Sequence, residues 1–226
     1  MPNHDDIYQN DAEQYHKLIS KQEDLIRHIE GIRSPDGLDI VDLGAGSGRL
    51  TTILAPRAKS IVAVDASDAM LRINGERLKA GGHDRWRTVV ADHRSLPLED
   101  RSADLVVAGW TISYLGSSNV PNYRDNIKQI IGEIRRILRP NGTVILFETM
   151  GTGEETPNPP DFLRSYYTAL EEEYGFSHRW IRTDYAFDSI EQAEELCRFF
   201  FGDEMAERVV SNRWQTVPEC AGIWWR

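Results

Sequence analysis

A glycine-rich turn is the part of this 226-residue chain whose residue types and spacing most directly suggest chemistry. It occupies residues 40–49, reads Ile-Val-Asp-Leu-Gly-Ala-Gly-Ser-Gly-Arg, and follows an apolar run. Glycine adopts backbone conformations closed to other residues and lets the chain approach a ligand closely. If the turn opens a helix, the free N–H groups at the helix start favour a carboxylate or a phosphate. The pattern predicts a binding loop, although GxGxG alone does not specify the ligand.

The residues around the glycines bear on which ligand the turn takes. A dinucleotide-binding turn carries a third Gly or Ala at position 49 for close helix packing, and this chain has Arg49. Asp42 is also not part of the dinucleotide pattern, and we expect its carboxylate to orient backbone amides or to meet a ligand's ammonium group. The turn therefore disfavours NAD, and an NAD-type nucleotide-dependent oxidoreductase stands only as an alternative function.

Two more acids follow predicted strands. Asp65 ends the second strand, where a carboxylate can accept both hydroxyls of a ribose. Asp92 ends the third strand and precedes His93, where a carboxylate can take the exocyclic amine of adenine. A single Asp at a strand end is commonly only a turn or cap residue. Three such acids with the glycines favour a pocket for an adenosine that carries an amino acid rather than a pyrophosphate.

Short apolar runs alternate with helical patterns along the chain, which is typical of parallel strands joined by helices. The pattern predicts strands over 38–43, 60–64, 87–90, 103–108, 143–148, 178–187 and 218–225. Helices are predicted over 11–30, 67–79, 121–140, 161–174 and 189–211. A further short helix is predicted to begin at Leu50 and to end at Pro56. The helix before Pro140 is the clearest, because its isoleucines recur at helical spacing. Asn141-Gly142 is a predicted turn.

Together these motifs resemble the class I S-adenosylmethionine (SAM)-dependent methyltransferases, in particular their small-molecule group of types 11 and 25. Residues 41–48 match (V/L)DxGxGxG, Asp65 matches the acid after the second strand, and residues 91–104 match xxDxxxLPxxxxxFD. Residues 138–143 match the LxPGG turn. The resemblance covers about residues 11–150.

The resemblance implies a Rossmann-like three-layer α/β sandwich, with a seven-stranded, mostly parallel sheet whose last strand is antiparallel. It implies a single methyltransferase domain over residues 1–226. Within it we expect an N-terminal helical segment over 1–32 and a cofactor-binding core over 33–150. Residues 151–226 would supply a lid helix, carrying Tyr166 and Tyr167, and the strands that complete the sheet.

The resemblance also implies SAM as the cofactor and assigns residues to it. The methionine carboxylate lies near Gly44 and Gly46, the ribose on Asp65, and the sulfonium near Trp110. The adenine lies between Ala66, Met70 and the Asp92-His93 turn. The full predicted cofactor-binding set is Tyr15, Asp42, Gly44, Ala45, Gly46, Asp65, Ala66, Met70, Asp92, His93, Gly109 and Trp110.

Methyl transfer from a sulfonium is an in-line displacement that neutralises charge, so positioning and desolvation can supply most of the acceleration. We predict Trp110, Tyr114 and Glu148 as catalytic residues. The two aromatic rings would line the acceptor pocket or stabilise a cation, or else only pack in the core. Glu148 would face the site or else cap a loop. The (Asp/Asn)-Pro-Pro-(Tyr/Phe) signature of DNA amino-methyltransferases is absent, which disfavours an exocyclic base amine as acceptor.

Charge is unevenly distributed. The chain carries a net charge of −10, of which residues 151–226 contribute −8, with 15 acids, 7 arginines and no lysine. A phosphate backbone is bound by clustered Lys and Arg, so the sequence predicts no nucleic-acid partner. We expect a small, neutral or cationic methyl acceptor. A catalytically silent, partner-binding member of the fold is a further alternative.

Three absences complete the prediction. No apolar run approaches the roughly 18 residues of a membrane span, so we expect a cytoplasmic protein without a membrane partner. Cys197 and Cys220 form no CxxC pair and are expected as buried free thiols. A metal-dependent methyltransferase would need an Asp-Asn pair at a strand end, and Asp125-Asn126 lies at a helix start, so no metal is predicted. Nothing in the sequence predicts the oligomeric state.

Overall fold

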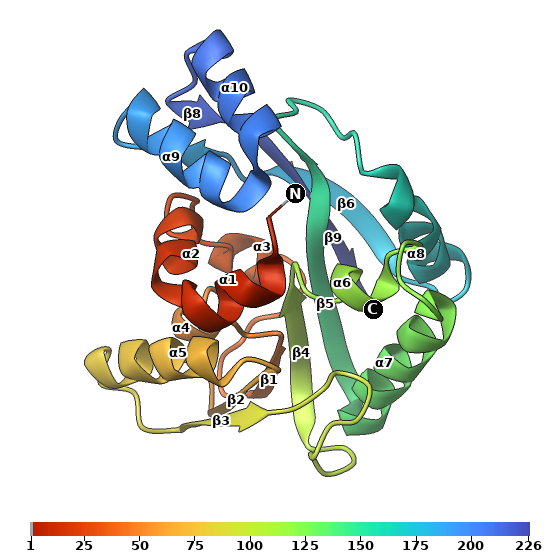
Figure 1. Cartoon of the computed structure of the whole chain (residues 1–226). Helices are drawn as coiled ribbons and strands as arrows, with labels where there is room; N and C mark the ends of the chain where they lie inside the picture. The colour runs from red at the N-terminus through yellow and green to blue at the C-terminus, as the bar shows by residue number, and fades with distance from the viewer. Residues whose placement is uncertain (1) are drawn as a thin grey trace.

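A seven-stranded sheet runs through the middle of the molecule and carries helices on both faces (Figure 1). The structure is a computed structural model that describes residues 2–226; Met1, which begins the predicted 1–32 segment, lies outside the described residues. The strands lie in the order β3 (Trp86–Val90), β2 (Ser60–Asp65), β1 (Asp39–Leu43), β4 (Ala103–Gly109), β5 (Leu138–Thr152), β9 (Glu219–Trp225) and β6 (Ser177–Arg182). A separate two-stranded sheet pairs β7 (Tyr185–Ala186) with β8 (Thr216–Val217).

Helices connect most of these strands. In chain order they are α1 (His4–Asn10), α2 (Ala12–Ile19), α3 (Ile26–Glu30), α4 (Thr51–Leu54), α5 (Asp68–Ala80), α6 (Ser113–Gly116), α7 (Tyr123–Ile137), α8 (Asp161–Glu172), α9 (Ile190–Phe201) and α10 (Asp203–Asn212). The predicted isoleucine face of α7 is confirmed, because Ile127, Ile130, Ile131, Ile134 and Ile137 are all buried.

The two faces of the sheet bury different helices. Successive side chains of a strand point to opposite faces, and in β4 Val106 and Ala108 pack with α7 and α8. Leu105 and Val107 face the other way and pack with residues of α3 and α4. The predicted three-layer sandwich is confirmed.

The topology creates a crevice beside β1. β1 pairs in parallel with β2 on one side and with β4 on the other, so the chain leaves β1 in one direction and later returns on the opposite side. In open α/β sheets, ligands bind at such a switch point, outside the carboxyl ends of the strands. β9 is antiparallel to both β5 and β6, as predicted for the last strand.

The prediction of one helix over 11–30 is wrong. The structure has α2 and α3 instead, separated by a turn, and α1 ahead of them. The break has a packing cause, because Leu18 is buried in the cluster around α9 whereas Leu25 is buried against the sheet. One straight helix cannot place both side chains in these two clusters.

Three further predicted boundaries differ from those of the structure. The strand over 178–187 ends at Arg182, because the Asp184 carboxylate accepts from Arg182 and from the backbone N–H of Glu219 and turns the chain into β7. The helix over 189–211 breaks at Gly202, whose φ is +92°. β5 begins at Leu138 rather than after an Asn141-Gly142 turn, and its pairing with β4 shifts between Ala103 and Leu105.

The N-terminal and C-terminal helices lie together over one end of the sheet. Figure 1 shows α1 and α2, in red, beside α9, in blue. Ile7 and Leu18 share a buried cluster with Leu196 and Phe200. The helix predicted as a lid, α8, does not take this position, because Tyr166 and Tyr167 are buried in the core beneath it. Among residues 2–226, no helix combines the length and apolar character required to cross a membrane.

Candidate functional site

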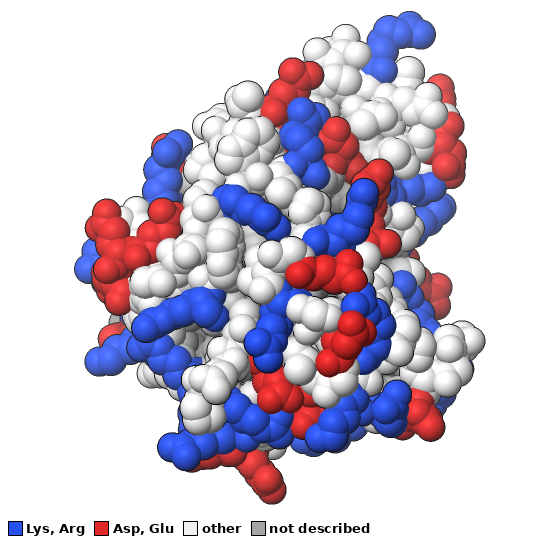
Figure 2. Space-filling view, turned by 180° about the vertical axis from the view of Figure 1, so that it is seen from behind, with Lys and Arg blue, Asp and Glu red and all other residues white. Residues whose placement is uncertain are grey.

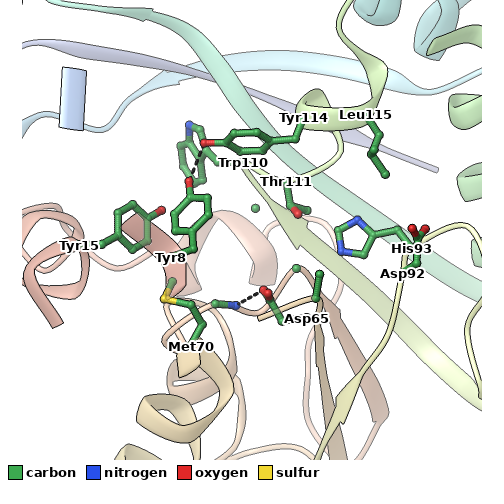
Figure 3. A pocket seen from close by; sticks show the side chains of 14 residues that line it. Tyr8, Tyr15, Asp65, Met70, Asp92, His93, Trp110, Thr111, Tyr114 and Leu115 are labelled. Carbon is green, nitrogen blue, oxygen red and sulfur yellow. Dashed lines mark hydrogen bonds between the residues drawn. The ribbon is translucent and has the colours of Figure 1, made fainter. Parts of the chain in front are cut away.

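A cavity of about 250 Å³ opens at the switch point, where β1, β2 and β4 end. Figure 3 shows the residues that line it: Tyr8, Tyr15, Gly44, Gly46, Asp65, Ala66, Met70, Asp92, His93, Gly109, Trp110, Thr111, Tyr114 and Leu115. The cavity brings together ten of the twelve residues predicted to bind a cofactor, all but Asp42 and Ala45. Of the predicted catalytic residues, Trp110 and Tyr114 line it and Glu148 does not.

The glycine turn forms one wall of the cavity. Gly44 and Gly46 have φ values of +70° and +51°, in the left-handed region that side chains disfavour. A Cβ on Gly44 would lie 2.1 Å from Oγ1 of Thr111, so the turn and the segment after β4 are in direct contact. A Cβ on Gly46 would lie 3.2 Å from Cε of Met70, toward the cavity. The absence of side chains thus leaves backbone exposed to the cavity.

Asp65 holds this turn in place. Its Oδ2 accepts a hydrogen bond of 2.8 Å from the backbone N–H of Gly46 (dashed line in Figure 3). Its Oδ1 accepts one of 2.8 Å from the backbone N–H of Ser67. A carboxylate has about four acceptor positions, so each oxygen retains capacity for a further donor. Asp65 therefore fixes the cavity wall and can also bind hydroxyl groups inside it.

Asp42 and Ala45 belong to the turn but do not line the cavity. Asp42 is fully buried and accepts a 2.5 Å hydrogen bond from Oγ1 of Thr51, which in turn accepts from Nδ2 of Asn74. Burial raises the pKa of Asp42 to about 7. Ala45 packs in a small apolar cluster against α5. Neither residue lines the cavity, so the structure places both as supports of the loop.

Asp92 and His93 lie on the opposite side of the cavity from the N-terminal tyrosines (Figure 3). Arg94 donates to both Asp92 oxygens, at 2.9 and 2.6 Å, and lowers the pKa of this carboxyl to about 2. His93 is buried, and burial lowers its pKa. Its Nδ1 has no hydrogen-bond partner. An ionised acceptor and a neutral imidazole therefore lie side by side.

Three lining residues were not predicted: Tyr8, Thr111 and Leu115. Tyr8 comes from α1, which the apolar pattern did not reveal; Asn3, whose Oδ1 accepts from the N–H of Asp6, is the local N-cap signal that marks the start of this helix. The Tyr8 hydroxyl lies 2.6 Å from that of Tyr114, which lies 3.0 Å from Nδ1 of His4. These contacts join α1 to α6 over the cavity.

Replacing Tyr8 by Phe is expected to loosen α1. The ring and its edge-to-face contact with Tyr15 remain, and the hydroxyl contact with Tyr114 is lost. One hydrogen bond contributes about 1 kcal/mol, so the backbone amides of α1 should exchange hydrogen several-fold faster than in the wild type. The control is Tyr123→Phe, which removes a hydroxyl that accepts from Arg124 at the surface. Equal exchange of α1 in the two variants would show that the Tyr8 hydroxyl does not anchor it.

Trp110 directly follows β4 and has an uncommon backbone conformation. Its φ is +54°, and its backbone N–H donates to the carbonyl of Phe147 at 2.7 Å. The Arg49 guanidinium lies 3.9 Å from the centroid of the indole, and Phe147 stacks with the ring at 6.1 Å. A non-glycine residue in this region is strained, and such strain concentrates at functional sites.

Glu148 lies behind the segment that follows β4. It is 1% exposed, and its Oε1 accepts from the backbone N–H of Ser113 at 3.1 Å and from the Tyr166 hydroxyl at 3.3 Å. Burial raises the pKa of Glu148 to about 7. The structure thus gives Glu148 the alternative predicted role, that of supporting a loop, and not a position in the cavity.

Replacing Glu148 by Gln is expected to weaken the pH dependence of stability. The pKa of Glu148 is about 7 in the folded protein and 4.5 ordinarily. The folded protein therefore binds this proton more tightly, so the contribution is fully present below about pH 4.5 and is lost as the pH rises through about 7. The shift corresponds to about 3 kcal/mol.

Urea unfolding at pH 5 and pH 8 measures this effect. Between these pH values the free energy of unfolding should fall by about 2.5 kcal/mol less in Glu148→Gln than in the wild type, because part of the effect lies below pH 5. The exposed Glu172, changed to Gln, serves as the control and should keep the wild-type dependence. If Glu148→Gln keeps it too, the carboxyl is not held protonated by the fold.

Comparison with known proteins shows which proteins the chain is similar to. A family model described as a methyltransferase domain matches residues 41–146, from the strand before the glycine turn through most of β5. The crystal structure of a SAM-dependent methyltransferase from Aquifex aeolicus superposes with a TM-score of 0.52 at 14% identity, over 97% of this chain and 90% of that one. The chain is thus similar to methyltransferases in the sequence of residues 41–146 and shares its fold with a SAM-dependent methyltransferase.

Two curated methyltransferases are similar in sequence. The demethylmenaquinone methyltransferase of Clavibacter sepedonicus is 35% identical over 130 residues, which are 58% of this chain and 46% of that protein. The phosphoethanolamine N-methyltransferase 1 of Caenorhabditis elegans is 29% identical over 161 residues, 71% of this chain and 32% of that protein. The chain thus spans less than half the length of either relative. Among the described residues, no group of three or more His, Cys, Asp or Glu is placed to hold a metal ion.

Proposed function

We propose that this protein transfers a methyl group from SAM to a small-molecule acceptor. The observation that carries the proposal is the cavity itself, in which the Gly44-to-Gly46 backbone, Asp65 and Asp92 converge at the switch point of the sheet. Bound SAM supplies a methyl group on a positively charged sulfonium. Among these residues, Asp65 can accept hydrogen bonds from the ribose of SAM and Asp92 can accept them from its adenine.

The lining residues fit such a cofactor. Gly44 and Gly46 carry no side chain that would keep a cofactor away from the backbone. Asp65 has acceptor capacity left for ribose hydroxyls. Ionised Asp92 can accept from an exocyclic amine, and the unpartnered Nδ1 of His93 offers a further polar contact.

The acceptor end of the cavity is built for positioning rather than for proton transfer. Trp110, Thr111, Tyr114 and Leu115 line it, and no carboxylate lies among these four. Apolar and aromatic walls exclude water and hold reactants at a fixed orientation, which is the main requirement of an in-line displacement. We therefore assign Trp110 and Tyr114 to the acceptor pocket and Glu148 to support of the loop between them.

We infer a small acceptor, and not a nucleic acid. The relatives are named for demethylmenaquinone and phosphoethanolamine, both small molecules. Figure 2 shows basic and acidic side chains interspersed over the face that Figure 1 hides. Basic residues are commonly paired with acids, as Arg139 is with Asp104 at 2.6 Å. A neutral or cationic acceptor fits the charge of −8 in residues 151–226.

The test is methyl transfer to acceptors of several classes, read as formation of S-adenosylhomocysteine (SAH) by mass spectrometry. Phenols, amines, thiols and acidic carbon compounds make up the panel. We expect SAH to form with at least one class, and to form at least tenfold more slowly in Trp110→Ala. Binding of SAH without transfer to any class would instead favour a catalytically silent, partner-binding protein.

A further inference from the structure

Helix α1 is bonded to both rims of the cofactor cavity. On one rim the carbonyl oxygen of Tyr8 accepts a hydrogen bond of 2.9 Å from Oγ of Ser67, which follows β2. On the other rim the Tyr8 hydroxyl lies 2.6 Å from that of Tyr114, in the helix α6 beyond β4 (Figure 3). Both Tyr8 and Tyr114 line the cavity. Because β2 and β4 end at the cavity, α1 bridges it from one rim to the other.

His4, at the start of α1, fastens this bridge at a third point. Its Nδ1 lies 3.0 Å from the Tyr114 hydroxyl, and its Nε2 lies 3.0 Å from the carbonyl oxygen of Phe200 in α9. A carbonyl can only accept, so Nε2 must carry a proton, and in the neutral ring Nδ1 then accepts from Tyr114. The imidazole also stacks on the Phe200 ring, with centroids 4.3 Å apart. One side chain therefore joins α1, α6 and α9.

Apart from these contacts, little of α1 is buried. The helix has seven residues, and among those whose side chains the structure describes, only Ile7 is buried. Segments with few buried apolar contacts open locally at a low cost in free energy. The glycine turn, in contrast, is tied to the end of β2 by the 2.8 Å hydrogen bond between Gly46 and Asp65. Of these two walls of the cavity, α1 is therefore the one that moves more easily.

The cavity is small for the proposed cofactor. Its volume is about 250 Å³, whereas pockets for drug-sized ligands have about 300–1,000 Å³ and bury most of the ligand surface. SAM and SAH are ligands of that size. A ligand buried to this extent enters or leaves only if one wall of the pocket moves. SAH must leave after each methyl transfer, so this movement belongs to every turnover.

We propose that α1 is a lid over the cofactor cavity and that His4 is the positioning residue that holds it closed. The lid opens when His4 and Tyr8 lose their contacts with α6 and α9. It turns about Asp11, whose non-helical backbone separates α1 from α2. The proposal rests on the proposed function, because the lid controls the exchange of SAM and SAH at that site. It gives α1 the role that the sequence predicted for α8.

Stopped-flow measurement of SAH binding, followed by tryptophan fluorescence, tests the proposal. Trp110 lines the cavity and contributes to this signal. The variant His4→Phe keeps a ring that stacks on Phe200 and removes both hydrogen bonds of the imidazole. We expect the association and dissociation rate constants of SAH both to rise at least fivefold, because α1 is open for a larger fraction of the time. A wall that only contacts the ligand would change the dissociation rate alone.

His28→Phe is the matched control. His28 is a half-buried histidine of α3, and the contact to Arg179, at 3.2 Å, is made by its backbone carbonyl. Both rate constants of this variant should equal those of the wild type. Tyr114→Phe removes the hydroxyl that joins His4 to Tyr8 and keeps the ring, so its association rate should also rise. Circular dichroism reports whether each variant folds, and Tyr114→Phe carries the test if His4→Phe does not.

The outcomes separate the lid from the proposed function. If the wild type binds SAH and the folded variants associate with it at the wild-type rate, α1 is a fixed wall and the proposal is overturned. A faster dissociation without a faster association leads to the same conclusion. If the wild type does not bind SAH at all, the proposed function fails, and the lid fails with it.

Discussion

Asp65→Ala is expected to weaken SAH binding by at least 100-fold. The substitution removes the acceptor of two backbone hydrogen bonds, from Gly46 and Ser67, and the acceptor proposed for the ribose. Hydrogen bonds to a charged group contribute about 1.5–3 kcal/mol each, and each 1.4 kcal/mol is a factor of ten in affinity. Loss of the two hydrogen bonds proposed between Asp65 and the ribose hydroxyls therefore weakens SAH binding by about 100-fold or more. Isothermal titration of the variant with SAH measures the loss.

Asp68→Ala is the control for this variant. Asp68 lies three residues further along, is exposed, and meets only Arg72, at 3.5 Å on the surface of α5. Its removal should leave SAH binding within about twofold of the wild type, because exposed ion pairs contribute little. If Asp65→Ala folds and binds SAH as tightly as Asp68→Ala does, Asp65 does not contact the cofactor.

Gly44→Ala is expected to damage both the turn and the cavity. The new Cβ would lie 2.1 Å from Oγ1 of Thr111 and 2.4 Å from its Cβ, so one of the two segments must move. The φ of +70° adds strain of about 1–2 kcal/mol for a residue with a side chain. We expect SAH affinity to fall at least tenfold and the free energy of unfolding to fall by more than 2 kcal/mol.

Gly37→Ala separates the effect of backbone strain from the effect of the steric clash with Thr111 that Gly44→Ala also introduces. Gly37 has nearly the same φ, +68°, but a Cβ there would meet nothing within 4 Å. It should show the loss of about 1–2 kcal/mol from strain alone and bind SAH normally. In Gly44→Ala, the further change Thr111→Gly should restore part of the affinity. Equal behaviour of the two alanine variants would mean that the contact between Gly44 and Thr111 does not shape the cavity.

The core of the fold was readable from local sequence. Strands β1, β2 and β4 are short apolar runs that end at or next to a Gly or an Asp, and α7 has an uninterrupted apolar face. Turns with Gly44 and Asp65 depend on residue types within a few positions of each other. Such local patterns can be recognised without knowledge of the tertiary structure. For this reason, most of the residues that were predicted to bind a cofactor do line the cavity.

What the sequence did not reveal depends on contacts between distant segments. Tyr8 reaches the cavity only because α1 packs beside α9, nearly two hundred residues away. Glu148 was placed in the site by its strand position, but the segment through Ser113 lies between it and the cavity. The break of the helix over 11–30 follows from two separate apolar clusters rather than from a helix-breaking residue.

Arg49 shows both the value and the limit of a motif. In the sequence it serves only as a departure from the dinucleotide pattern. In the structure it is a guanidinium against the Trp110 ring, with a polar atom that has no partner. No spacing rule indicates that Glu219, 170 residues further along the chain, lies within reach of its charge.

Isothermal titration of the unmodified protein with SAH and, separately, with NADH tests the central claim most directly. Both ligands carry an adenosine, but one ends in an amino acid and the other continues through a pyrophosphate. The cavity at the ends of β1, β2 and β4 predicts one equivalent of SAH bound and no heat from NADH. Binding of NADH without binding of SAH would contradict the assignment and restore the oxidoreductase alternative.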